Sequence, residues 1–246
     1  MTPMKRNSFS ELEHLLLSKE NALGLNVPEY SLELAKDSGK SGWMYQSKKN
    51  LRPEEALTCF LEDHGYTVMG EEGRLIKMVH SLMCLVAHEE HQNGSMTRTS
   101  KSGNRTILLR PCFAMSPTAE FTKEHFRSII SEASIDSIIE YLEDFGDLLR
   151  RKDTIGFDPD ELDLIYGFIE AVGTQKLLNI FEAASNEGSF FGGWPDIVAI
   201  RDSIAHLVEV KTTDSITKKQ KDWICTFKNI LDIPYSIIRL KKMNQI

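Results

Sequence analysis

The sequence predicts an α/β fold with a mixed central sheet flanked by helices, together with a helical N-terminal portion. Apolar residues recur at helical spacing through most of residues 53–184, and the period changes to two at residues 196–212. A further helix and a last strand follow this change. The 246 residues supply enough apolar material for one large domain or two small ones.

Residues 1–52 are expected to form the helical N-terminal segment. Apolar residues are spaced as in a helix over residues 10–35, with a break at Pro28, and the polar, glycine-containing residues 36–50 are expected to form a loop. The SGKSG stretch in that loop lacks the glycine that a phosphate-binding loop needs, because that position is Leu34. No nucleotide site is therefore expected here.

The remaining residues, 53–246, are expected to form one larger domain. Pro53 opens a helix whose two first-turn glutamates suit the helix dipole, and Gly65 ends it. Four elements are expected after it: a short strand or turn at 66–70, an apolar helix at about 70–88, an exposed loop at 92–106, and a helical insertion at about 118–184.

The C-terminal third changes to strand periodicity. Strands are expected at 196–201 and 206–212, joined by the DSIA stretch into an antiparallel hairpin. A helix follows and stops before Pro234, and residues 235–240 form the last expected strand. Thr217 and Gln220 have the spacing of a capping box at the start of that helix.

Composition and charge restrict the function classes. The net charge of −7 argues against a protein that coats nucleic acid generally, but four basic clusters permit local recognition of a polyanion: residues 97–110, 150–152, 218–221 and 239–242. The chain has no run of about 18 apolar residues and no secretory signal, so no membrane contact is expected. Four scattered cysteines indicate a cytoplasmic protein with reduced, mostly buried thiols, and HEEH at 88–91 matches no zinc spacing.

An aspartate, a glutamate and a lysine meet on the predicted hairpin. With its centre near residues 203–204, Asp196 lies opposite Lys211, and Glu209 lies diagonally across, about 7–8 Å away at the backbone. Two carboxylates at this separation suit Mg²⁺ or Mn²⁺, and the lysine can orient a water molecule or stabilise negative charge. The alternative is an exposed hairpin face with an ordinary Asp–Lys pair, which spacing alone favours equally.

The surroundings of this hairpin resemble a known nuclease family. GGWPDIVAI and LVEVKTTDSITKKQKDWI are similar in order and spacing to the virus-type replication-repair nuclease (VRR-NUC) module of the PD-(D/E)XK superfamily. Within it, the Fanconi-associated nucleases are the most similar branch. The matching residues, all within the region 185–242, are Gly193, Pro195, Asp196, Glu209, Val210, Lys211, Gln220 and Trp223.

The resemblance implies a restriction-endonuclease-like core and a Mg²⁺- or Mn²⁺-dependent nuclease that cuts branched or ended DNA. It implies metal ligation by Asp196, by Glu209 and by the Val210 carbonyl. It also places an acid on the first core helix, which nominates Glu72 as a catalytic and metal-binding residue, with Glu71 second; the alternative for Glu72 is a first-turn acid favoured by the helix dipole.

Other side chains of this region are expected to support the site or the core. Gln220 is expected beside the active site, or as a simple helix cap, or both, whereas Trp223 is expected in the core, and His206 and Cys225 are expected to be structural. The basic residues expected to contact DNA phosphates are Lys218, Lys219, Lys221 and Arg239.

The function expected from the sequence is structure-selective DNA cleavage in repair or recombination. Two alternatives are a catalytically silent DNA-binding or scaffold protein and a defence or mobile-element endonuclease. The chain is compatible with a homodimer or with repair or defence partner proteins, and the intact Asp196, Glu209 and Lys211 favour an active enzyme.

Overall fold

The computed structural model describes residues 12, 19–21, 25, 27–37, 42–70, 72–76, 79, 97–99, 105–107, 159–173, 175–177, 179 and 193–243. The chain divides into two compact units, residues 1–73 with 191–246, and residues 74–190. The boundary expected between residues 52 and 53 falls inside the first unit. No helix of the described residues has the length and hydropathy needed to cross a membrane.

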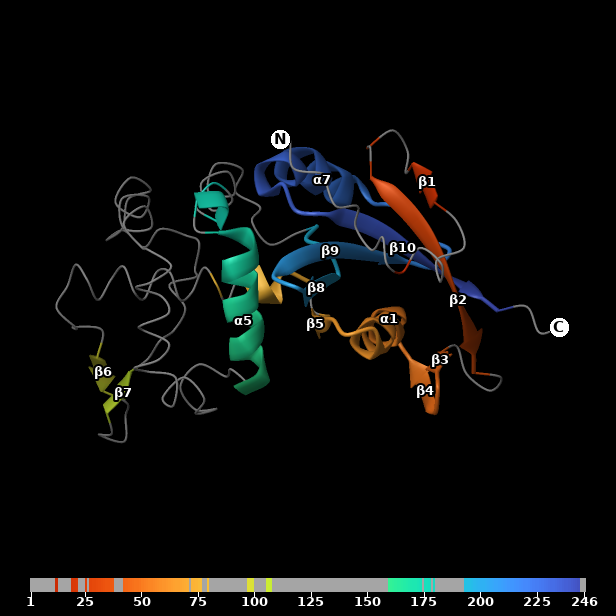
Figure 1. The fold of residues 1–246 in the computed structure, drawn as a ribbon, viewed down its shortest axis with the longest axis horizontal. Helices are drawn as coiled ribbons and strands as arrows, with labels where there is room; N and C mark the ends of the chain where they lie inside the picture. The colour runs from red at the N-terminus through yellow and green to blue at the C-terminus, as the bar shows by residue number, and fades with distance from the viewer. Residues whose placement is uncertain are drawn as a thin grey trace. The chain divides into compact units, whose positions relative to one another are not determined.

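The first unit is built on one mixed sheet, which confirms the α/β class (Figure 1). Among the described residues its order is β4-β3-β2-β10-β9-β8-β5, and β1 pairs with β2 beside this path. β10 runs parallel to β2 and to β9, and the other pairs are antiparallel. The strands are β1 (Lys19–Asn21), β2 (Pro28–Lys36), β3 (Trp43–Tyr45), β4 (Lys48–Leu51), β5 (Thr67–Met69), β8 (Ile197–Arg201), β9 (Ile204–Lys211) and β10 (Tyr235–Lys242).

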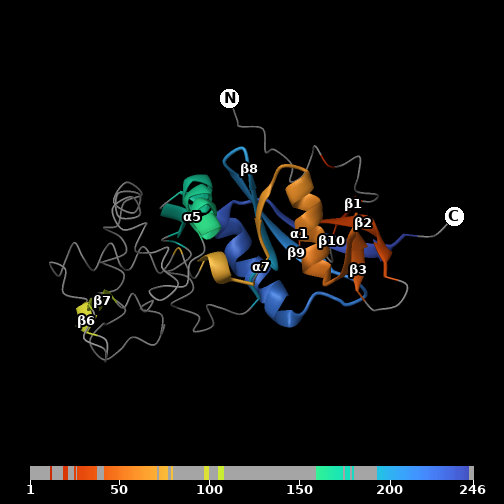
Figure 2. The same cartoon turned by 90° about the horizontal axis from the view of Figure 1, so that it is seen from below.

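Helices α1 (Pro53–Asp63) and α7 (Lys218–Leu231) cover opposite faces of this sheet, as Figures 1 and 2 show together. Both helices confirm the sequence prediction. The apolar side of α1 joins a core cluster with alternate residues of the central strands, including Val208, Val210 and Ile238. On the other face, Trp223 of α7 packs against Trp194 and Tyr235, with ring centroids 4.9 and 5.7 Å away. The expected core position of Trp223 is confirmed, since 3% of it is exposed.

The expected N-terminal helix is wrong for residues 19–21 and 28–36, which form strands β1 and β2. β2 occupies residues 28–36 and lies between β10 and β3, with Tyr30 and Leu32 buried. The expected loop at 36–50 instead contains β3 and β4, which bury Trp43. In both places, pairing with strands distant in the sequence outweighs the local pattern. Residues 1–11, 13–18, 22–24, 26 and 38–41 lie outside the described part.

The hairpin of β8 and β9 is confirmed, but its expected register is wrong. Its turn contains only Asp202 and Ser203, which both have left-handed backbone angles (φ 51° and 56°). Such a two-residue turn matches the twist of the two strands. Ile197 therefore pairs with Val208, and extending the ladder by one residue places Asp196 opposite Glu209.

The second unit is described only in part. Helix α5 (Pro159–Val172) confirms one of the expected helices. Two short strands, β6 (Thr97–Thr99) and β7 (Arg105–Ile107), pair with each other where an exposed loop was expected. Their threonines and isoleucine have β-branched side chains, which suit a strand. The HEEH stretch, Cys84, Cys112 and most of the expected helices at 70–88 and 118–184 lie outside the described residues. The other two cysteines are free but not buried, so that expectation is wrong for them: Cys59 is partly buried and Cys225 is exposed.

Candidate active site

The acids and the lysine lie on two neighbouring strands. Asp196 immediately precedes β8, and Glu209 and Lys211 lie at the end of β9. Because side chains alternate along a strand, Glu209 and Lys211 share the α7 side of the sheet, and Val210 faces the α1 core. The structure therefore brings together the three residues expected to carry the chemistry.

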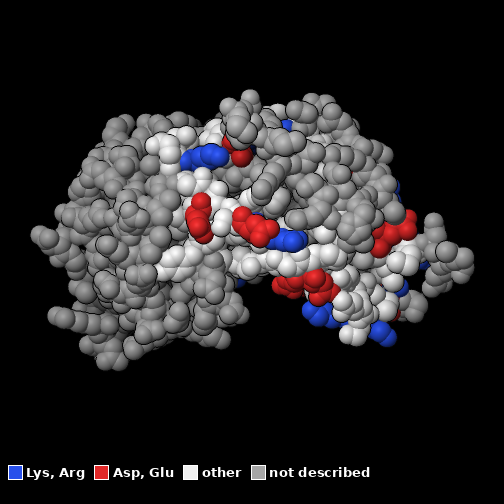
Figure 3. Space-filling model, in the orientation of Figure 1, with Lys and Arg blue, Asp and Glu red and all other residues white. Residues whose placement is uncertain are grey.

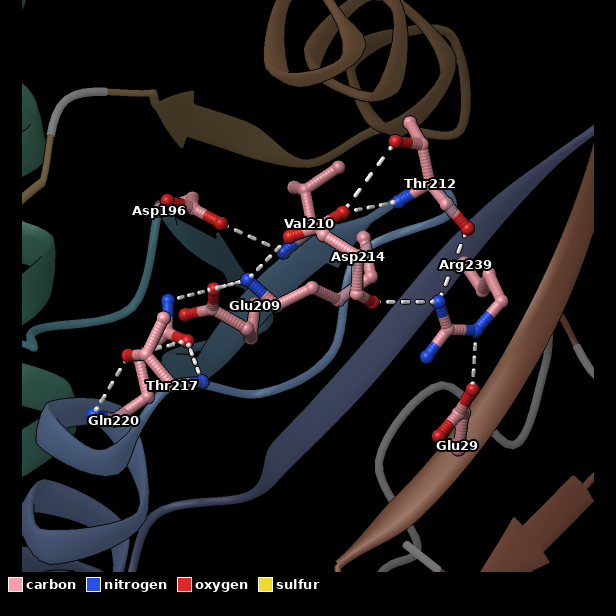
Figure 4. A network of polar contacts seen from close by, with 10 residues as sticks. Glu29, Asp196, Glu209, Val210, Thr212, Asp214, Thr217, Gln220 and Arg239 are labelled. Carbon is pink, nitrogen blue, oxygen red and sulfur yellow. Dashed lines mark hydrogen bonds and ion pairs between the residues drawn. The ribbon is translucent and has the colours of Figure 1, made fainter.

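Asp196 links the start of β8 to the end of β9. Its Oδ2 accepts a hydrogen bond of 2.8 Å from the backbone N–H of Val210 (Figure 4). Burial raises the pKa of Asp196, although the Val210 N–H and the charge of Lys211 act to lower it. The aspartate is thus fixed by the backbone of the strand that carries the glutamate.

Glu209 is fully buried, and its two carboxylate oxygens have different surroundings. Oε1 lies 2.8 Å from Nζ of Lys211 and also accepts a hydrogen bond from Nε2 of Gln220 (Figure 4). Oε2 is buried and has no hydrogen-bond partner among the described residues. Two donors therefore occupy one oxygen and leave the other available to a cation.

The surroundings of Glu209 disfavour its ionised form. Burial, together with the charge of Asp196, raises the pKa of Glu209 from 4.5 to about 8, and this outweighs the opposing effect of Lys211. Burial acts to lower the pKa of Lys211, but Glu209 and Asp214 reverse this and raise it. The lysine is charged, and it neutralises only part of the negative charge that two ionised carboxylates would carry.

Gln220 is oriented by the start of α7. Oε1 of its amide accepts hydrogen bonds from the backbone N–H and the hydroxyl of Thr217, at 2.9 and 3.0 Å. The Thr217 hydroxyl in turn accepts from the Gln220 backbone N–H at 3.3 Å, which confirms the capping box. Since the amide oxygen is held at the helix end, the amide nitrogen points to Glu209. Gln220 is therefore both a cap and a neighbour of Glu209.

The turn before Asp196 needs glycine at residue 193. Gly193 has a φ of 87°, and a Cβ there would lie 2.8 Å from the carbonyl oxygen of Lys219 in α7. Its N–H donates a 3.0 Å hydrogen bond to Oε1 of Glu72. The structure thus places Glu72 against the backbone of the turn and does not bring it together with Asp196 and Glu209.

A different upstream acid, Glu54, acts on the aspartate through its charge. The charge of Glu54, in the first turn of α1, adds to the effects that raise the pKa of Asp196. From the sequence, Glu54 was expected only to be a first-turn residue that suits the helix dipole, and no spacing signal connects it with a position 142 residues later. Glu71 lies outside the described residues. The described residues contain no group of three or more acids, histidines or cysteines arranged to hold a metal ion.

The basic residues expected to contact DNA lie in two environments. Lys218, Lys219 and Lys221 are exposed in the first turn of α7. Arg239 on β10 is 23% exposed and is engaged with Glu29 at 2.6 Å. In the view of Figure 3, described acidic and basic side chains are interspersed and form no continuous basic face.

The donor set fits a hard divalent cation. Asp196 and Glu209 supply carboxylate oxygens, which Mg²⁺ and Mn²⁺ prefer. A cation between them would offset the charge of Asp196, which helps to raise the pKa of Glu209. The unpartnered Oε2 of Glu209 supplies an available buried oxygen. His206, also on β9, is buried with its ring 5.7 Å from that of Tyr66, as expected of a structural residue.

Comparison with known proteins supports the fold. No protein-family model and no curated protein matches the chain. Among solved structures, it is similar to paFAN1 bound to DNA with a two-nucleotide 5′ flap and a gap, at 19% identity and a TM-score of 0.55. A second paFAN1 structure, with a one-nucleotide 5′ flap and a gap, gives 20% identity and a TM-score of 0.53. These matches cover 94% and 93% of this chain, which spans 40% of paFAN1.

Proposed function

We propose that this chain is a divalent-metal-dependent deoxyribonuclease with a PD-(D/E)XK-type core of the VRR-NUC kind. The observation that supports it best is the buried Glu209 beside the half-buried Asp196, with Lys211 and Gln220 both directed at one oxygen of the glutamate. A merely structural ion pair needs no second carboxylate beside it. The fold likeness to paFAN1 and the resemblance of residues 185–242 to Fanconi-associated nucleases point the same way.

Each residue has a distinct role in the proposed site. Asp196 and Glu209 hold Mg²⁺ or Mn²⁺, with the Val210 carbonyl as a further ligand. An ion held there would lower the pKa of a bound water molecule and would stabilise charge on the phosphate. The Lys211 ammonium lies beside Glu209, where it orients the attacking water and stabilises the negative charge that develops on the scissile phosphate. Gln220 keeps the glutamate in one orientation.

Two upstream acids are assigned different tasks. Glu72 supports the Gly193 turn through its hydrogen bond, so we propose that it positions Asp196 and is not itself a ligand. Glu54 adds negative charge near Asp196, which increases the preference of the site for a cation.

The proposed substrate is DNA with a branch or an end, and 5′ flaps are the first structure to test. Lys218, Lys219 and Lys221 are proposed to contact phosphates, since they are exposed and lie on the helix that carries Gln220. Each lost contact should reduce the salt slope of DNA binding by about one. Charge reversal of these three lysines that leaves affinity and its salt dependence unchanged would place the DNA elsewhere.

Cleavage of labelled DNA tests this function directly. Purified protein is incubated with single-stranded, duplex, 5′-flap and junction DNA in Mg²⁺, Mn²⁺ or EDTA. We expect metal-dependent cleavage that Asp196→Asn and Glu209→Gln each reduce at least about a hundredfold. Asp202→Asn is the matched control, because it removes one exposed carboxylate at the other end of the hairpin. DNA binding without cleavage by the wild type would instead favour a scaffold protein.

A further inference from the structure

Asp214 is a second acid in contact with the proposed catalytic lysine. Its Oδ2 lies 3.2 Å from Nζ of Lys211, whose distance to Oε1 of Glu209 is 2.8 Å. Oδ1 of Asp214 accepts hydrogen bonds from the backbone N–H and the hydroxyl of Thr212, at 3.1 and 3.4 Å. One carboxylate oxygen thus fixes the loop, and the other holds the lysine.

The loop that carries Asp214 is anchored by Arg239. Nη1 of Arg239 donates to the carbonyl oxygens of Thr212 and Asp214, at 3.0 and 3.1 Å (Figure 4). Its Nε donates to Oε1 of Glu29 at 2.6 Å, so the guanidinium is itself held by β2. Arg239 pairs in register with Lys211 on β9. Two neighbouring strands therefore determine where Asp214 meets the lysine.

The two acids around Lys211 respond differently to a cation. A divalent ion held by Glu209 neutralises the charge that attracts the ammonium, and it also repels the ammonium directly. Asp214 is directed at the lysine from the loop, and its side chain is 58% exposed, so its charge is retained. Without the charge of Asp214, little attraction would offset the entropy cost of holding the long and flexible lysine side chain near the ion.

We propose that Asp214, anchored by Arg239 and Glu29, is a positioning residue that retains Lys211 in the site when a divalent cation binds Glu209. This inference rests on the proposed nuclease function. It gives Arg239 an anchoring role in place of a phosphate contact, since its guanidinium bonds to Glu29 and to two carbonyl oxygens of the loop.

Kinetics separate this role from a general effect of charge. Asp214→Asn keeps an oxygen for Thr212 but removes the charge that holds the lysine. We expect kcat to fall at least about tenfold. KM for flap DNA should stay equal or decrease, because a negative charge near the DNA is lost. The control Asp202→Asn removes one exposed charge from the turn between β8 and β9 and should leave kcat unchanged.

A double-mutant cycle tests whether Asp214 acts through the lysine. In a Lys211→Ala background, Asp214→Asn should change kcat by less than about twofold, because the group that it positions is absent. An equal loss of kcat in both backgrounds would overturn the proposal.

A lysine at position 239 tests the anchoring role of Arg239. Arg239→Lys keeps the charge but loses the planar guanidinium with its several donors, so kcat should fall while the salt slope of DNA binding stays the same. A reduced salt slope with normal kcat would assign Arg239 to DNA binding instead.

Crystal structures provide a readout that does not depend on cleavage. Wild type and Asp214→Asn are soaked with Mn²⁺ in the absence of DNA. We expect Lys211 to stay within hydrogen-bond reach of Asp214 in the wild type and to leave the site in the variant. A lysine in the same place in both Mn²⁺-bound structures would overturn this role alone. A wild type that binds no Mn²⁺ would overturn the proposed function as well.

Discussion

Replacing Glu209 by glutamine tests how burial and charge shape the site before any metal binds. A rise in the pKa of Glu209 from 4.5 to about 8 corresponds to about 4–5 kcal/mol against ionisation, at 1.36 kcal/mol per pKa unit. The native protein then keeps a proton that the unfolded chain releases. The free energy of unfolding of the metal-free protein should therefore fall as the pH rises from about 4.5 to about 8.

The assay is urea unfolding of EDTA-treated protein at a series of pH values within this window. Wild type should lose up to about 1.4 kcal/mol per pH unit, whereas Glu209→Gln should show little slope and exceed wild type in stability near pH 8. Adding Mg²⁺ should restore wild-type stability at the upper end, because the cation binds the deprotonated native site. Glu62→Gln, at an exposed position of α1, is the control and should keep the wild-type slope.

Two outcomes would refute this reasoning. A wild-type stability that is flat or increases with pH would mean that Lys211 neutralises Glu209 fully, so that burial and Asp196 do not dominate. An equal slope in Glu209→Gln would assign the titration to another group.

Three further substitutions test the framework of the site. Gly193→Ala should lower the free energy of unfolding by about 1–3 kcal/mol and reduce cleavage, because its Cβ would press on the Lys219 carbonyl at a positive φ; normal stability by urea unfolding would argue against this contact. Tyr235→Phe should leave that free energy unchanged or raise it by about 1 kcal/mol, because the buried hydroxyl has no partner among the described residues; a clear loss of stability would reveal one. Ser203→Gly should raise the midpoint of thermal unfolding, because glycine adopts a φ of 56° without the backbone strain of about 0.5–1 kcal/mol that serine carries there. A lower midpoint would contradict the turn geometry.

The sequence alone predicted the features that depend on residues close together in the chain. Periodicity predicted α1, α7 and β10, since each depends on residues within one element. The Thr217–Gln220 capping box was readable because both partners lie within one helical turn. Asp196, Glu209 and Lys211 were predicted to lie together, and they do, because the alternation of side chains along a strand persists when the register shifts by two residues.

Only the tertiary structure decided the features that join distant residues. The turn at Asp202 and Ser203 has positive φ without glycine, so composition alone did not indicate its length or the register. β2 became a strand through pairing with β10, more than 200 residues later, and that pairing outweighs local helical spacing. The contacts of Glu29 with Arg239 and of Glu72 with Gly193 also span more than 100 residues. Such contacts depend on which strands become neighbours in the sheet, and no periodicity within a single segment contains that information.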